Sequence, residues 1–324
     1  MADETAGRGG PLQDKLVVLI GGTGFFGTHL AQALLARGCR LRVVSRRPER
    51  AFRLRPLSNL GQVQLVGGDA TRPKTLARSL AGAYGVVNLA GAFAGELDQL
   101  QGQGAGGVAA LAREAGVQAY VQISALGADA GSAIDYSRTK AEGEEAVRAA
   151  FPSATIVRPS VLFGEDDRFV NLFARLIARL PAVPVFAPTA RLQPLHVDDA
   201  AEAVANALAD PLRHGGRTYD IAGPEAIAMI DLNRRIAAAQ GRQRLFIALP
   251  DAISGAFATL VGWLPGAPLS PDQWALLKPG NVLHGDNGLA ALGVSPRPLA
   301  LFLDRWMVRY RKHGRFGTKT SPAA

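Results

Sequence analysis

Residues 15–27 limit what this chain can fold into more than any other stretch. The apolar residues 16–20 lead directly into Gly21-Gly-Thr-Gly-Phe-Phe-Gly27, and a helical pattern follows. A buried strand, a tight glycine turn and a helix N-terminus in this order are typical of a dinucleotide-binding unit. The glycines let the backbone approach a pyrophosphate, and the first helical turn offers it free N–H groups. We therefore expect a bound dinucleotide here, the alternative being a tight turn that binds nothing. The loop residues expected to contact it are Gly21, Gly22, Thr23, Gly24, Phe25, Phe26 and Gly27.

Apolar, β-branched runs alternate with helical patterns along the first two thirds of the chain. The predicted strands are 15–20, 40–45, 62–67, 85–90, 118–124 and 154–159. The predicted helices are 25–37, 73–81, 98–115, 135–150, 168–180 and 198–209. Continuous apolar strands between helices indicate a parallel sheet covered on both faces. With right-handed crossovers, this is an α/β fold with a doubly wound Rossmann sheet.

The alternation loosens after about residue 160, where prolines and glycine-rich turns become frequent. We expect a flexible N-terminus over 1–14 and a Rossmann domain over 15–163. A smaller cap region for substrate or partner follows over 164–304, and its part near 192–222 returns to the sheet. Residues 305–324 are expected to form a basic C-terminal tail.

The tip of the second predicted strand indicates which cofactor is bound. An NAD site would place Asp or Glu there to hold the ribose hydroxyls, whereas this chain has Ser45, Arg46 and Arg47. A guanidinium suits a 2′-phosphate, which it binds through paired charge-assisted hydrogen bonds. We therefore favour NADP(H) over NAD(H); the alternative is that both arginines are ordinary solvated loop charges.

Two further strand tips are expected to line the cofactor. Asp69 follows the third strand and is placed either to accept a hydrogen bond from the adenine amino group or to cap the next helix. Leu89, Ala90 and Gly91 end the fourth strand, where small residues would let a cofactor lie against the backbone; the alternative is that Gly91 is simply a turn residue.

Ser124, Tyr136 and Lys140 form the candidate catalytic set. Tyr136 and Lys140 are one turn apart on one face of a predicted helix, so the ammonium would favour the phenolate and lower the pKa of the phenol. Tyr136 could then act as a general acid or base toward a carbonyl or an alcohol. Lys140 could also reach the nicotinamide ribose, and Ser124 at the fifth strand tip could hold the substrate oxygen. The alternative is a plain helix surface.

Charge and composition exclude several classes of function. The chain has 324 residues and a net charge of +9, and residues 305–319 hold six Lys or Arg. This basic end suits an anionic membrane surface or an acidic partner, or it is a solvated tail. No nucleic-acid-binding motif accompanies it. Cys39 is the single cysteine, no cluster has metal-ligand spacing, and we expect neither a signal peptide nor a membrane span.

The glycine loop, Tyr136-Ser-Arg-Thr-Lys140 and Arg158-Pro-Ser-Val-Leu-Phe-Gly164 resemble an extended or atypical short-chain dehydrogenase/reductase. A narrower resemblance, carried most specifically by Asp167-Arg-Phe-Val-Asn171, is to the nucleotide-binding accessory subunit of respiratory complex I (alpha subcomplex subunit nine) and its bacterial homologues. This resemblance implies a tightly bound NADPH and a role in holding or assembling a quinone-reducing membrane complex. It also implies a cytoplasmic location or a peripheral one on the inner membrane face, or the matrix-equivalent compartment. Relatives are also linked to ubiquinone biosynthesis.

Two functions therefore compete. The first is an NADP(H)-binding subunit or assembly factor of complex I that holds its cofactor structurally. The second is an independent NADPH-dependent reductase or epimerase acting on an apolar substrate such as a quinone precursor or lipid. The nearly uncharged residues 245–264 suit either one, as a contact with membrane or partner or as a wall of a substrate pocket.

Overall fold

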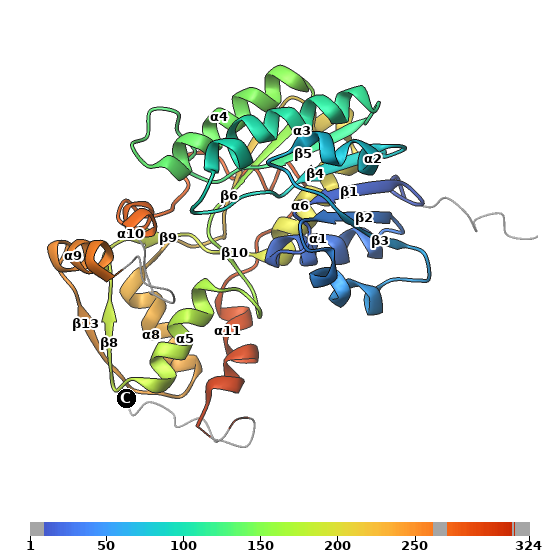
Figure 1. Ribbon diagram of the computed structural model, residues 1–324. Coiled ribbons are helices and arrows are strands. Elements are labelled where there is room, and N and C mark those ends of the chain that lie inside the picture. Colours follow the sequence, from blue (N-terminus) through green and yellow to red (C-terminus); the bar gives the residue numbers. More distant parts are fainter. Residues whose placement is uncertain (1–9, 262–270, 313, 315–324) are drawn as a thin grey trace, which may run out of the picture. The chain divides into compact units, whose positions relative to one another are not determined.

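The computed structural model describes residues 10–261, 271–312 and 314. Its main feature is a parallel sheet of seven strands in the order β11-β6-β5-β4-β1-β2-β3 (Figure 1). In chain order the strands are β1 (Leu16–Ile20), β2 (Arg40–Ser45), β3 (Val63–Gly67), β4 (Gly85–Asn88), β5 (Ala119–Ile123), β6 (Thr155–Pro159) and β11 (Thr218–Ile221). The predicted α/β fold with a doubly wound parallel sheet is confirmed.

The strand order creates a switch point at β1. Ile20, the last residue of β1, pairs with Val44 of β2 on one side and with Asn88 of β4 on the other. The chain winds away from β1 in both directions, so the connections that follow β1 and β4 diverge at their carboxyl ends. In open α/β sheets, ligands bind at this kind of crevice.

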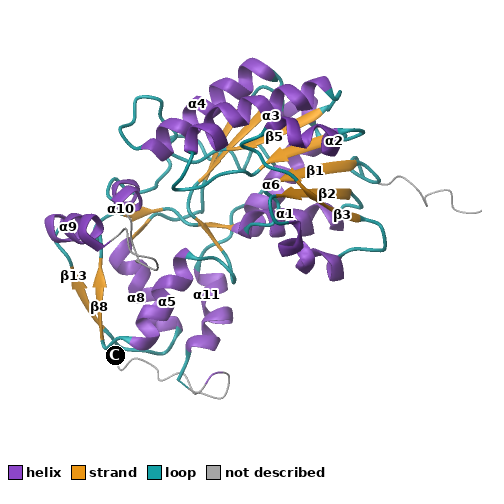
Figure 2. Cartoon of the chain, viewed as in Figure 1, coloured by secondary structure: helices purple, strands orange, loops and turns teal. Residues whose placement is uncertain are grey.

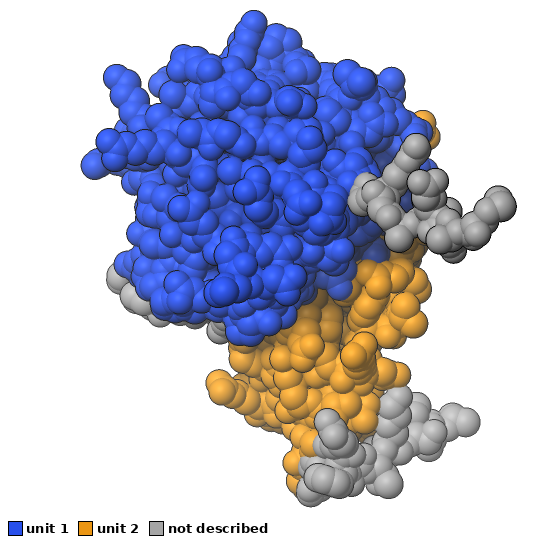
Figure 3. All heavy atoms as spheres, turned by 90° about the vertical axis from the view of Figure 1, so that its right-hand side faces the viewer, with its two compact units in different colours: residues 1–159, 198–220, 287–294 blue, residues 160–197, 221–286, 295–324 orange. Residues whose placement is uncertain are grey.

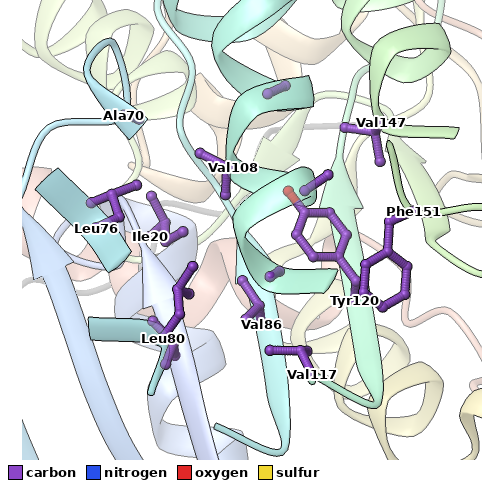
Figure 4. Packing of buried hydrophobic residues seen from close by; sticks show 14 of the residues in the cluster. Ile20, Ala70, Leu76, Leu80, Val86, Val108, Val117, Tyr120, Val147 and Phe151 are labelled. Carbon is purple, nitrogen blue, oxygen red and sulfur yellow. The ribbon is translucent and has the colours of Figure 1, made fainter. Parts of the chain in front are cut away.

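Helices cover both faces of the sheet. α2 (Ala77–Leu80), α3 (Gln103–Glu114) and α4 (Asp135–Ala150) lie on one face, and α1 (Phe25–Ala36) and α6 (Val197–Ala209) lie on the other (Figures 1 and 2). On the first face, side chains of α3 and α4 pack on the strands around Val86 and Tyr120 (Figure 4). The central strand β1 is apolar throughout because both of its faces are covered, whereas the edge strand β3 is partly exposed and carries Gln64.

The six predicted strands and the helices around them match the structure to within about two residues, but β11 was not predicted as a strand. Three other differences stand out. β4 ends at Asn88 rather than at residue 90, because the Asn88 side chain accepts the Ala90 N–H at 3.1 Å and turns the chain. A π-helical turn, η3 (Asp98–Gly102), precedes α3. An unforeseen 3₁₀ segment, η1 (Pro48–Leu57), follows β2 and includes Pro56, which an α-helix interior would not tolerate.

The chain divides into two compact units (Figure 3). Unit 1 comprises residues 1–159, 198–220 and 287–294, and it includes the sheet together with η2 (Pro73–Leu76) and α7 (Pro211–His214). Unit 2 comprises residues 160–197, 221–286 and 295–324. The boundary after Pro159 lies close to the change of pattern expected near residue 163.

Unit 2 is built from short strand pairs and helices. Its strands are β7 (Leu162–Phe163), β8 (Ala182–Val185), β9 (Arg191–Leu192), β10 (Leu195–His196), β12 (Ile227–Ala228) and β13 (Leu245–Ala248). Its helices are α5 (Phe169–Arg179), α8 (Met229–Ala239), α9 (Asp251–Val261), α10 (Pro271–Leu277), α11 (Ala300–Trp306) and η4 (Met307–Tyr310). α5, α8 and α11 share one buried apolar cluster.

Two segments singled out in the sequence fall in unit 2. The apolar run 245–264 forms β13 and α9, and its last residues, 262–264, lie outside the described part. The chain is helical through Tyr310, so the first residues of the expected basic tail belong to a packed element, with Trp306 and Met307 buried. Arg315 and Lys319 lie outside the described residues. Within the described ranges, no helix is both long and apolar enough to span a bilayer.

Candidate functional site

Three of the four loop glycines are required by the fold itself. Gly21 has φ +76°, and the left-handed region favours glycine. A Cβ on Gly22 would lie 2.8 Å from the Leu19 Cβ, and a Cβ on Gly27 would lie 2.6 Å from backbone atoms of Gly22. These glycines therefore let α1 begin close against the end of β1.

Gly24 is different, because nothing in the fold requires it to be glycine. Its φ of −79° and ψ of 177° are open to any residue. A Cβ at this position would meet a single neighbouring atom, the Gly21 oxygen, at an ordinary 3.7 Å. Gly24 is the N-cap of α1 and provides no side-chain cap, so the first N–H groups of the helix lack intrahelical partners. Open space beside free N–H groups is the cradle that a pyrophosphate needs.

Thr23, Phe25 and Phe26 complete the loop and the start of α1. The Phe25 ring packs edge-on against His29, with ring centroids 5.3 Å apart, one turn along the helix. Phe25 and Phe26 supply backbone N–H groups in the first turn of α1, where an anion would lie.

The end of β2 carries a buried hydroxyl without a partner. The Oγ of Ser45 is buried and has no hydrogen-bond partner among the described residues. Arg46 and Arg47, which follow it, are exposed. A buried unpaired hydroxyl loses free energy unless a ligand or water satisfies it. A ligand at the end of β2 would therefore meet the Ser45 hydroxyl and the two exposed guanidinium groups of Arg46 and Arg47.

Asp69 forms a local turn after β3. Its carboxylate accepts hydrogen bonds from the Thr71 N–H at 3.1 Å and from the Thr71 hydroxyl at 2.9 Å. One carboxylate oxygen is therefore committed to the chain itself, two residues before η2 begins at Pro73. This geometry is an Asx-type turn rather than a bond to the helix N-terminus.

The carboxyl end of β4 brings backbone next to Lys140. Leu89 donates its N–H to the Ile20 oxygen at 2.9 Å, and a Cβ on Gly21 would lie 3.2 Å from the Ala90 nitrogen. A Cβ on Gly91 would lie 3.0 Å from the Nζ of Lys140. Glycine at position 91 therefore makes room for the ammonium group, and the strand tip is bare backbone as a flat cofactor requires.

Lys140 lies at the tip of β5. It is 6% exposed, and its Nζ donates to the Ile123 carbonyl at 3.2 Å. Ser124, the next residue after Ile123, is buried, and its Oγ has no partner in the described structure. The structure thus brings Lys140 and Ser124 to the same strand end, with Ser124 offering a second unsatisfied hydroxyl.

Tyr136 stands one turn before Lys140 on α4. The Lys140 Nζ lies 5.9 Å from the centroid of the Tyr136 ring. Phe93, in the loop after β4, stacks on that ring with centroids 4.7 Å apart and planes inclined by 20°. Phe93 itself is 51% exposed. The phenol is therefore covered on one ring face by a side chain that is open to solvent.

The electrostatics of the pair differ from the expectation. Burial raises the pKa of the Tyr136 phenol to about 12, so the expected lowering by Lys140 is wrong for this structure. Burial also lowers the pKa of Lys140 to about 8, against an opposing effect of Glu144. Desolvation disfavours the charged form of each group and here outweighs their mutual influence.

The segment 167–171 has a structural role in unit 2. Asp167 accepts hydrogen bonds from the N–H groups of Gly164, at 3.1 Å, and Val170, at 2.7 Å, and so caps α5. Asn171 accepts from the Arg309 guanidinium at 2.7 Å and the Tyr310 hydroxyl at 2.9 Å. The segment therefore holds the C-terminal helical end in place.

Two contributors to the site were not foreseen from the sequence. Glu144 continues the i, i+4 series of Tyr136 and Lys140 on α4, so helical spacing could have found it. Phe93 had no comparable signal, because only the loop conformation brings it onto Tyr136. Among the described residues, no group of three or more His, Cys, Asp or Glu side chains could hold a metal ion.

Comparison with known proteins places this geometry in context. The chain matches the family model described as NAD(P)H-binding over residues 21–211. A Dictyostelium discoideum protein named NADH dehydrogenase (ubiquinone) 1 alpha subcomplex subunit 9 is 32% identical over 65% of this chain and 60% of its own length. A Caulobacter vibrioides ceramide reductase is 32% identical over 84% of this chain and 85% of its own length. An Arabidopsis thaliana subunit 9 protein is 30% identical over 94% of this chain and 81% of its own length. The expected resemblance is thereby confirmed.

Solved structures show the same fold at lower identity. Citrobacter triphenylmethane reductase complexed with NADP(H) has a TM-score of 0.71 and 20% identity, covering 88% of this chain and 97% of that one. A Staphylococcus aureus nucleoside-diphosphate-sugar epimerase has a TM-score of 0.70 and 16% identity, covering 89% of this chain and 99% of that one.

Proposed function

Since the chain belongs to the NAD(P)H-binding family, we propose that it holds NADP(H), in preference to NAD(H), along the carboxyl ends of β1, β2, β4 and β5. The observation that carries this proposal is a pair of buried hydroxyls, on Ser45 and Ser124, that have no hydrogen-bond partner among the described residues and lie at the ends of two strands on either side of the Gly24 cradle. Both hydroxyls would be satisfied by one extended dinucleotide. Arg46 and Arg47 would bind its 2′-phosphate.

The chain's own residues have distinct tasks at the other end of the cofactor. Lys140 would donate to the nicotinamide ribose from its place beside Gly91 and the Ile123 carbonyl. Ser124 would hold the oxygen of a carbonyl substrate, and Tyr136 would give it a proton. A phenol with a pKa of about 12 is protonated at neutral pH, as a proton donor to a carbonyl must be. When bound, the cofactor would supply the reducing equivalent.

We further propose that the protein serves respiratory complex I as an NADP(H)-binding accessory subunit or assembly factor. Support comes from relatives named complex I subunit 9 that align with most of this chain. In this chain, residues 167–171 bind the C-terminal helical end. Its place would be the cytoplasm or the inner face of the membrane, in contact with complex I, with the basic residues after Arg311 next to anionic lipid. The cofactor would then stabilise the fold by mass action.

A second function is favoured by a specific observation. Ser124, Tyr136 and Lys140 are all present near one strand end, and a relative that aligns with 84% of this chain is named a ceramide reductase. An independent NADPH-dependent reductase of an apolar carbonyl compound, such as a lipid or quinone precursor, would need this arrangement.

Tyr136→Phe separates the two functions, because it removes the phenolic proton and leaves the fold and the Phe93 stack. Cells carrying this variant are compared with the wild type and with a deletion, by native electrophoresis of mild-detergent membrane extracts and by lipid and quinone analysis. For an accessory subunit, we expect wild-type complex I levels in Tyr136→Phe and a loss in the deletion. A phenotype equal to the deletion, with an accumulating carbonyl compound, would establish the reductase instead.

A further inference from the structure

The surroundings of Lys140 disfavour its positive charge. It is almost fully buried, and burial lowers its pKa to about 8. Because this value is close to physiological pH, the protonated form has only a small margin there. Its Nζ donates to the Ile123 carbonyl and lies near the Tyr136 ring, and neither of these groups carries a full negative charge. A buried lysine needs a compensating anion to stay protonated.

Among the buried residues of α4, Glu144 is the one carboxylate. It stands one turn after Lys140, on the face that already carries Tyr136 and Lys140, and it is 1% exposed. Its charge opposes the effect of burial on Lys140. A carboxylate this deeply buried is itself expensive to keep ionised, unless it is paired and hydrogen-bonded.

Two arginines keep Glu144 in place. Arg158, from β6, binds the carboxylate with both of its arms, Nε to Oε1 at 2.7 Å and Nη2 to Oε2 at 2.6 Å. Arg148, one further turn along α4, donates to the same Oε2 at 3.0 Å. Such a bidentate pair fixes both position and direction. Asp220 of β11 lies 3.6 Å from Arg158 and balances part of its charge.

We propose that Glu144 is a positioning residue for Lys140: its carboxylate, fixed by Arg158, is the negative charge that keeps the Lys140 ammonium ready for the cofactor ribose. The charged and titratable groups around Lys140 are then Tyr136, Glu144 and Arg148 on α4, with Arg158 and Asp220 behind them. The segments that follow β4 and β5 bring uncharged groups next to Lys140, namely Gly91 and the Ile123 carbonyl. This inference rests on the proposed cofactor site.

NADPH binding measured against pH tests the inference without any need for turnover. The dissociation constant is titrated by NADPH fluorescence from pH 7 to pH 9.5, for the wild type and for Glu144→Gln. In the wild type, affinity should fall as Lys140 loses its proton near pH 8. Removing the carboxylate lowers the pKa of Lys140, so in Glu144→Gln the fall should begin about one pH unit lower. At pH 8 that shift makes binding about fivefold weaker.

Two further variants sharpen the result. Glu142→Gln removes the same charge from the same helix, but Glu142 is 39% exposed and pairs with Arg138, so its profile should match the wild type. Arg148→Gln keeps the pair between Glu144 and Arg158 but removes a nearby cation, so its fall in affinity should move to higher pH. Arg148 is 40% exposed, which makes this variant informative even where Glu144→Gln does not fold.

The outcomes distinguish this inference from the function on which it rests. A wild-type protein that binds no NADPH would refute the proposed cofactor site. Wild-type binding with an unchanged pH profile in Glu144→Gln, or with a lower rather than a higher midpoint in Arg148→Gln, would overturn the role of Glu144 alone. Equal shifts in Glu142→Gln and Glu144→Gln would show that any negative charge on α4 has this effect, and would overturn the specific role of Glu144.

Discussion

Gly24 offers a way to remove cofactor binding while keeping the fold. In Gly24→Val the side chain would occupy the space that the pyrophosphate needs, so we expect NADPH binding to be lost. The backbone at φ −79° and ψ 177° is extended and accepts a β-branched residue, and the Cβ meets only the Gly21 oxygen at 3.7 Å. Replacing the glycine N-cap costs about 0.5–1 kcal/mol, and the more restricted unfolded chain returns about 0.4–1 kcal/mol. The cofactor-free protein should therefore be about as stable as the wild type.

The cofactor-bound proteins should differ strongly. At a ligand concentration of about 100 times its dissociation constant, binding stabilises the folded state by about 2.7 kcal/mol. For a unit of this size, that corresponds to about 5–10 °C in Tm. Thermal melts with and without NADPH should show this increase in the wild type and none in Gly24→Val.

Gly27→Ala is the matched control for the variant at Gly24. Its Cβ would lie 2.6 Å from backbone atoms of Gly22, so it should destabilise the cofactor-free protein by about 1–3 kcal/mol. The reasoning is refuted if NADPH raises the Tm of Gly24→Val as it does in the wild type. It is equally refuted if Gly24→Val unfolds the cofactor-free protein while Gly27→Ala does not.

Three further predictions concern charge and protonation. Arg46→Ala should weaken NADPH binding about ten- to a hundredfold and leave NADH binding nearly unchanged, and an equal loss for both in fluorescence titrations would remove the 2′-phosphate assignment. The pKa of Lys140 falls from 10.5 to about 8 on folding, so the free energy of unfolding should increase as pH rises between about 8 and 10.5. Chemical denaturation at several pH values should show a smaller increase in Lys140→Met. Phe93→Ala should lower the pKa of Tyr136 from about 12 toward its usual value. The Tyr136 signal in an absorbance titration is identified as the one that is missing in Tyr136→Phe. Phe52→Ala, at a similarly exposed phenylalanine, should leave the pKa of Tyr136 unchanged.

Local sequence patterns predicted the parts of the fold that local physics decides. Strands buried on both faces read as continuous apolar runs, and the glycine turn after β1 has one compatible geometry, so both could be placed from the residues alone. The pairing of Tyr136 with Lys140 followed from helical spacing. Ser124 was included because of its position at the tip of the preceding predicted strand.

The features that could not be predicted from the sequence depend on contacts between distant parts of the chain. The bond from Arg158 to Glu144 joins β6 to α4, and nothing in either segment's own pattern selects that pairing. The pKa of Tyr136 was predicted in the wrong direction, because the neighbouring charge of Lys140 can be read from the sequence and the burial of the phenol cannot. The helical end at Tyr310 was assigned to a tail because its bond to Asn171 crosses 139 residues.

The nucleotide that the protein carries tests the central claim most directly. Protein purified from its native cells without added nucleotide is denatured, and the released small molecules are separated and identified by mass spectrometry. We expect NADP(H) from the wild type in an amount close to one per chain, and none from Gly24→Val prepared in the same way. NAD(H) in its place, or equal amounts of NADP(H) from both proteins, would contradict the account.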